Sequence, residues 1–161
     1  KTRFIRFSCY NANKLSNDKL SSIIIHNENC NRLSCNCNTI IKRCNDIIYL
    51  GVHIDCHLKW DLHIHSITKK IRSLIYIFSS IKCILDKQRL KTIYYGLCQS
   101  LLNYGLLVWG DAAKVYLKQL FVTQKLLLKI TFNKPRLYSS SQLFLLCQSL
   151  VALAFTQIEL V

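Results

Sequence analysis

Two stretches of helical periodicity between residues 61 and 104 constrain the fold of this chain more than any other feature. The first is a run whose apolar side chains recur every three or four residues, as on the buried face of an amphipathic helix: Ile64, Ile67, Ile71, Leu74, Ile75, Phe78 and Ile81. The second has an apolar stripe of the same kind: Leu90, Ile93, Tyr94, Leu97, Leu101 and Tyr104. Asp61 and Asp86 precede the two patterns and can cap them, because aspartate at a helix start accepts backbone N–H bonds. We therefore predict two packed helices.

A third helix is predicted to begin near Asp111 and to end before Pro135, because proline cannot continue a helix. The apolar face of this helix would include Val115, Leu120, Leu127 and Leu128. Residues 139–161 are strongly apolar, but their polar members interrupt the run of ~20 apolar residues that a bilayer requires. We expect a core helix there, packed against a partner outside this sequence, and no membrane span.

The first 58 residues carry strand patterns instead. Basic and apolar residues alternate over residues 1–9, and short apolar runs follow at 23–25 and 39–41. The clearest run, residues 47–54, is broken by the single glycine Gly51. The predicted fold is therefore α+β: a short antiparallel β-hairpin region in residues 1–58, followed by a helical bundle in residues 59–161.

The charge of the chain points to a polyanionic partner. Its 161 residues include 22 Lys and Arg against 8 Asp and Glu, a formal charge of +14. Nucleic acid is the first partner to consider and an anionic membrane surface the second. The candidate binding cations, which belong to the predicted first and third helices and lie away from their apolar stripes, are Lys69, Lys70, Arg72, Lys114, Lys118, Lys125 and Lys129. The last four are spaced by four, seven and four residues and so share one helical stripe. A solvated surface without any partner would have the same pattern.

No catalytic or metal-binding motif is recognisable. A magnesium site for nucleotidyl transfer needs at least two convergent carboxylates, and the few Asp and Glu of this chain form no short paired motif. His26 with Cys30, Cys35, Cys37 and Cys44 suggests zinc, but the paired CxxC spacing of a structural zinc site is absent. We predict no metal site. The odd total of nine irregularly spaced cysteines favours a reducing, intracellular setting.

Several short blocks follow one another in a specific order along the chain. They are Lys1-Thr2, Tyr49-Leu50-Gly51-Val52-x-Ile54-Asp55, Leu58-x-Trp60-x-x-His63-Ile64, Leu101-x-Asn103-Tyr104-Gly105-x-x-Val108-Trp109-Gly110, Leu120-x-x-x-Gln124-Lys125-x-x-Leu128-Lys129-Ile130 and Ser141-Gln142-Leu143-Phe144. In this order and at these separations, the blocks resemble the C-terminal part of the reverse transcriptases of non-LTR (LINE-type, jockey-like) retrotransposons. The resemblance covers nearly the whole chain.

The resemblance assigns the two parts of the chain to different subdomains of the polymerase. Residues 1–58 would be the last strands of the palm, with a primer-grip-like turn at Tyr49, Leu50 and Gly51, and residues 59–161 the helical thumb and the connection after it. The family's catalytic aspartates belong to upstream palm motifs that this sequence does not contain, so we expect a fragment that is inactive alone. Mg²⁺ would belong to the complete parent enzyme. Lys1 is the single candidate catalytic residue, as a general acid.

The resemblance also implies the partners. These would be the RNA template and the RNA–DNA duplex, bound through their phosphates by the seven thumb cations named above, and the missing N-terminal part of the polymerase. Localisation would be intracellular, with no membrane contact. Two alternatives remain open: a small basic helical adaptor that binds acidic protein or membrane surfaces, and a degenerate reading frame without function.

Overall fold

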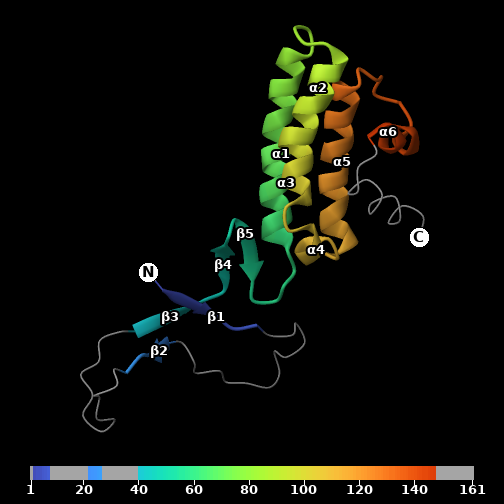
Figure 1. Cartoon of the computed structure of the whole chain (residues 1–161). Coiled ribbons are helices and arrows are strands. Elements are labelled where there is room, and N and C mark those ends of the chain that lie inside the picture. Colours follow the sequence, from blue (N-terminus) through green and yellow to red (C-terminus); the bar gives the residue numbers. More distant parts are fainter. Residues whose placement is uncertain (1, 8–21, 27–39, 148–161) are drawn as a thin grey trace. The chain divides into compact units, whose positions relative to one another are not determined.

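The computed structural model describes residues 2–7, 22–26 and 40–147 (Figure 1). The chain divides into two compact units, Lys1–Lys59 and Trp60–Val161, one residue after the boundary expected from the sequence. The described part of the first unit contains strands, and that of the second contains helices. The predicted α+β fold, in which a β-hairpin region precedes helices, is confirmed.

The first unit contains two small sheets. The larger one is mixed, because β1 runs parallel to β3 whereas β2 runs antiparallel to it. Its strands are β1 (Arg3–Ile5), β2 (Ser22–Ile24) and β3 (Ile40–Cys44). The half-buried thiol of Cys44 donates a hydrogen bond to the carbonyl oxygen of Phe4, at 3.4 Å between sulfur and oxygen. This cysteine of the zinc hypothesis therefore ties β3 to β1.

The second sheet is the hairpin of β4 (Asp46–Tyr49) and β5 (Val52–Asp55). The sequence predicted one interrupted strand here, and the interruption is a two-residue turn that reverses the chain. Leu50 and Gly51 both have positive φ, 48° and 79°. Two consecutive residues of this kind match the twist of a tight hairpin, and glycine takes such a conformation without strain.

The second unit is built around three long helical segments (Figure 1). Its elements are α1 (Asp61–Ile81), α2 (Lys87–Tyr94), the π-helical segment η2 (Tyr95–Gln99), α3 (Ser100–Asn103), α4 (Leu106–Trp109), α5 (Lys114–Thr131) and α6 (Ser140–Cys147). α1 and α5 pack along one another, and α2, η2 and α3 form one continuous helix beside them. The buried apolar residues of all these segments form one core.

The two aspartates predicted as helix caps behave differently. Asp61 is the first residue of α1, and Trp60 holds the N-cap position with a left-handed φ of 64°. The Asp61 carboxylate accepts the N–H of Leu62 at 2.8 Å, so the predicted cap was one residue too late. Asp86 does occupy the N-cap position of α2, but its carboxylate makes no capping hydrogen bond.

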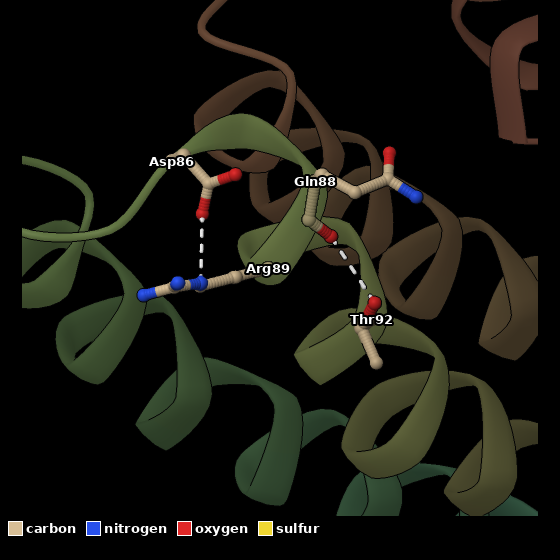
Figure 2. Close-up of polar contacts among 4 residues, drawn as sticks. All are labelled: Asp86, Gln88, Arg89 and Thr92. Atoms are coloured by element: carbon tan, nitrogen blue, oxygen red, sulfur yellow. Dashed lines mark hydrogen bonds and ion pairs between the residues drawn. The ribbon is translucent and has the colours of Figure 1, made fainter.

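Figure 2 shows the polar contacts that Asp86 and the first turn of α2 do make. The carboxylate of Asp86 pairs with the guanidinium of Arg89 at 3.4 Å, and the hydroxyl of Thr92 donates to the carbonyl oxygen of Gln88 at 3.1 Å. Both members of the ion pair are exposed, so it contributes at most about 1 kcal/mol. The start of α2 is therefore held mainly by the packing of Leu90, which is buried.

The second helix contains a register shift that the sequence pattern does not reveal. In η2, the N–H of Ser100 bonds to the carbonyl oxygen of Tyr95, five residues back instead of four. One extra residue in a turn rotates everything after it, so Cys98 and Leu102 are buried where Leu97 and Leu101 were predicted. Leu97 is 48% exposed. The predicted stripe is correct up to Tyr94; beyond it Leu97 and Tyr104 are exposed, and Leu101 packs against the core with part of its side chain exposed.

The carbonyl groups loosened by the π-helical turn are satisfied by a neighbouring side chain. The hydroxyl of Ser100 donates to the carbonyl oxygens of Gly96 and Leu97, at 2.5 Å and 3.2 Å. Gly96 lies in the same turn, and a Cβ atom added to it would meet nothing within 4 Å. The backbone of η2 is thus hydrogen-bonded, while open space lies next to its glycine.

We predict that Gly96→Ala raises the free energy of unfolding by about 0.5–1 kcal/mol, because alanine loses less conformational entropy than glycine in a helix. Urea denaturation followed by circular dichroism measures the difference. Gly110→Ala is the opposing control, since its Cβ would lie 2.5 Å from the carbonyl oxygen of Leu106 and should destabilise the fold. A destabilised Gly96→Ala would mean that η2 requires glycine.

Two sequence blocks that are far apart in the chain meet in the core of the second unit. Trp109 is fully buried, and its indole N–H donates to the carbonyl oxygen of Tyr104 at 2.9 Å. The ring of His63 meets the Trp109 ring edge-on, with 5.9 Å between centroids. Gly105 is the N-cap of α4 and has a left-handed φ of 66°, a conformation that glycine adopts without strain.

A buried polar pair connects the second helix with α5. Gln124 and Tyr94 are both fully buried, and the amide nitrogen of Gln124 donates to the Tyr94 hydroxyl at 3.1 Å. The amide oxygen of Gln124 is buried without a hydrogen-bond partner. A buried amide of this kind fixes the position of α5 against α2 more than it adds stability.

Candidate nucleic-acid interface

One face of α1 carries four exposed polar or aromatic side chains in a row. They are His65, Lys69, Arg72 and Tyr76, which we call the α1 row. Their spacing of four, three and four residues places them on one side of the helix, over about 16 Å of its length. Tyr76 is 78% exposed, which is unusual for a large aromatic side chain. The row combines cations that can meet phosphates with a ring that can meet a base.

The third predicted cation of α1, Lys70, does not belong to this row. It is exposed on another side of the helix, at the edge of a groove between α1 and the bulged second helix. This groove, which we call the π-bulge groove, has a volume of about 420 Å³. It is lined chiefly by Lys70, Leu74, Gly96, Leu97, Leu101 and Tyr104. The structure thus separates Lys70 from Lys69 and Arg72.

The four lysines predicted to form a stripe on α5 differ in their surroundings. Lys114 and Lys118 are exposed, whereas Lys125 and Lys129 are half-buried. The ammonium group of Lys125 lies 4.0 Å from the centroid of the Phe121 ring. That of Lys129 donates to the carbonyl oxygen of Arg136, in the segment after the helix. The stripe is present in the helix, but its second half makes contacts within the protein.

The turn predicted to be primer-grip-like lies at the tip of the β4–β5 hairpin. Tyr49 is 62% exposed and Leu50 is 72% exposed, so the tip carries two large apolar side chains. Leu50 also has positive φ, a position that asparagine or glycine usually occupies in a turn of this kind. A strained, exposed leucine is a feature that packing within the hairpin does not explain.

We predict that Leu50→Asn stabilises the β4–β5 hairpin by about 1 kcal/mol, because asparagine tolerates positive φ better than leucine. Hydrogen exchange at the hairpin amides measures this locally, without requiring the whole chain to unfold. Ile48→Asn is a suitable control, because Ile48 is exposed to a similar degree but has an extended backbone. Faster exchange in Leu50→Asn would contradict the prediction.

The candidate catalytic and metal-binding residues have less definite places. Lys1, Cys30, Cys35 and Cys37 lie outside the described residues. In the part of the chain that is described, no three or more His, Cys, Asp or Glu side chains are grouped so that they could hold a metal ion.

The carboxylate of Asp55 accepts the backbone N–H groups of His57 and Lys59, each at 2.9 Å, and so shapes the loop before α1.

The spacing of apolar residues does not by itself reveal two features of this surface, the exposure of Tyr76 and the π-bulge groove. Tyr76 and Tyr94 both lie in helical patterns, but Tyr94 is buried and Tyr76 is exposed. The spacing of Tyr76 from Lys69 and Arg72 was the available signal. The π-bulge groove could not be foreseen, because it depends on the register shift. Gly96, an isolated glycine in a helical pattern, was its only trace in the sequence.

A second hollow, with a volume of about 290 Å³, lies where the end of α1, the start of α2 and the end of α5 meet. Lys82, Asp86 and Lys87 are among its lining residues. Opposite charges at its rim make it a less consistent anion site than the α1 row. We therefore regard the α1 row and the exposed half of the α5 stripe as the candidate interface.

Comparison of the chain with known proteins gave no match to a family model, a curated protein or a solved structure. Within the described residues, no helix is both long enough and apolar enough to cross a membrane.

Proposed function

We propose that this chain is the thumb-bearing part of a non-LTR retrotransposon reverse transcriptase, and that it binds the template–primer backbone through phosphates. The proposal rests on the ordered blocks of the sequence together with the exposed cations of the helical unit. The chain contains none of the palm motifs that carry the family's catalytic aspartates, so polymerisation and its Mg²⁺ are assigned to the complete enzyme. The role of this part is to hold nucleic acid.

The α1 row is the single observation that supports this proposal most. Lys69 and Arg72 are exposed, lie on one face and are separated by one helical turn. Cations arranged along a rigid helix can meet successive phosphates without reading the bases, which suits an enzyme that must copy any sequence. Lys114 and Lys118 repeat the arrangement at the start of α5.

The direct test is the salt dependence of binding. We expect the full chain to bind a fluorescent RNA–DNA duplex with an affinity that falls steeply between about 50 and 200 mM salt. With four exposed cations in contact, the slope of log affinity against log salt should be about −3 to −4. Fluorescence anisotropy measures it. A salt-independent affinity would rule out binding through phosphates.

A basic adaptor that binds an acidic protein surface is the second candidate. It is favoured by the exposed apolar residues of α4 and the start of α5, where Leu107 is fully exposed and Val115 is 79% exposed. Exposed apolar residues near cations are common at protein interfaces. Binding to an acidic protein, without any binding to duplex nucleic acid, would favour this function over the first.

A further inference from the structure

The π-bulge groove is lined by two leucines that a regular helical stripe would bury, and neither is fully buried here. The extra residue of η2 turns Leu97 outward and leaves Leu101 only partly buried against the core, while Cys98 and Leu102 are fully buried. Gly96 adds no side chain to fill the space beside them. The floor of the groove is thus apolar, open and built on a hydrogen-bonded helix.

The rim of the groove has a different chemistry from its floor. Tyr104, which is 52% exposed, contributes an aromatic side chain, and Lys70 contributes a cation. Lys70 follows Lys69 of the α1 row in the sequence, but it lies about 100° further round the helix, on the side that faces the groove. A flat apolar group that is joined to a phosphate fits this combination of leucines, tyrosine and lysine.

We propose that the π-bulge groove binds one unpaired nucleobase of a strand whose phosphates lie along α1, with Lys70 on the phosphate of that nucleotide. This inference rests on the proposed function, because it needs a strand already held by the cations of the helical unit. Bases inside a duplex are stacked and paired, so the occupant is a base from a single strand or from the frayed end of a duplex.

We expect the groove to bind the four bases with similar affinity, because most of its lining is apolar and offers stacking and dispersion contacts. The hydroxyl of Ser100, which also lines the groove, donates its proton to carbonyl groups of its own helix. The leucines offer only dispersion and apolar contact. Stacking against apolar and aromatic side chains tolerates all four bases. Sequence independence of this kind agrees with binding through phosphates elsewhere on the unit.

The test compares three labelled ligands by anisotropy with the full chain: oligothymidylate, a fully abasic oligomer of equal length, and a blunt duplex. The abasic strand offers the same phosphates without bases. We expect the wild-type chain to prefer oligothymidylate over the abasic strand by about fivefold or more. In Gly96→Leu, whose side chain fills the groove, this preference should disappear, while the abasic strand and the duplex bind as before.

Three further variants separate the contributions. Ser79→Leu adds the same side chain at an exposed position of α1 outside the groove and should keep the preference. Lys70→Gln should weaken binding of oligothymidylate and of the abasic strand by a similar factor and leave their ratio unchanged. Gly96→Ala, which fills less space, serves in place of Gly96→Leu if thermal melting shows that the latter is unfolded.

Photocrosslinking places the base directly. A single 5-iodouracil in the oligothymidylate should crosslink to the peptide that contains Tyr104, and Gly96→Leu should abolish that product. An unchanged preference in Gly96→Leu, or crosslinks confined to Tyr76, would overturn the proposal. The proposal would also be overturned if Gly96→Leu abolished binding of an acidic leucine-rich peptide but left binding of oligothymidylate unchanged. Failure of all three nucleic acids to bind would instead refute the proposed function.

Discussion

Replacing Trp109 with alanine should lower the free energy of unfolding by about 3–5 kcal/mol, because a fully buried indole is removed and a cavity remains. The substitution also removes the indole N–H that donates to the carbonyl oxygen of Tyr104 and the ring that His63 packs against. A small domain is stable by only about 5–15 kcal/mol, so a large share of its stability would be lost. Urea denaturation followed by far-ultraviolet circular dichroism measures the change.

The matched control for this variant lies two residues away in the same short helix. Leu107 is fully exposed, so Leu107→Ala should change the free energy of unfolding by no more than about 0.5 kcal/mol. If Trp109→Ala cannot be purified, Trp109→Phe keeps most of the packing and loses the indole N–H, at a cost of about 1–3 kcal/mol. If Trp109→Ala were as stable as the wild type, packing around Trp109 would not contribute to the stability of the helical unit.

Neutralising the α1 row should weaken nucleic-acid binding roughly a hundredfold at about 50 mM salt, because each lost phosphate contact costs roughly tenfold there. The variant is Lys69→Gln with Arg72→Gln, measured by anisotropy on the same RNA–DNA duplex. The salt slope should become shallower by about 2, one unit for each cation removed. Both side chains are exposed, so the fold should be unaffected.

Two double variants test whether position matters as well as charge. Lys82→Gln with Lys87→Gln removes two exposed cations from the opposite end of α1 and the start of α2. It should reduce affinity far less than the α1-row variant. Lys114→Gln with Lys118→Gln should also weaken binding, since both lysines are exposed. If all three double variants lost the same amount of affinity, binding would depend on the net charge of the chain and not on the positions of the cations.

The sequence predicted α1 well, because a single regular pattern controls it. Ile64, Ile67, Ile71 and Phe78 were predicted to be buried, and all four are. The third helix was predicted less well: it begins at Lys114 instead of near Asp111, and Val115 is exposed. Residues five apart point about 140° away from each other on a helix, so Val115 cannot share a face with Leu120.

The surroundings of the cations could not be predicted from spacing. Lys125 and Lys129 have the same helical phase as Lys114 and Lys118, and the spacing rule treats all four alike. Their fates differ because Phe121 lies next to Lys125 and the carbonyl group of Arg136 reaches Lys129 from the segment after the helix. Contacts of that second kind depend on how the chain folds back, which no periodicity records.

The π-helical turn has a consequence for recognising relatives of this protein. A relative with an unbroken α-helix would have one residue fewer between Tyr94 and Leu102, and its alignment with this chain would need a single-residue gap there. In an alignment without that gap, each residue of α3 would be matched to a residue of the relative that lies on a different face of the helix. Loss of that one codon would therefore restore the regular helical stripe, with Leu97 toward the core, and would change the groove that Gly96 and Leu97 line.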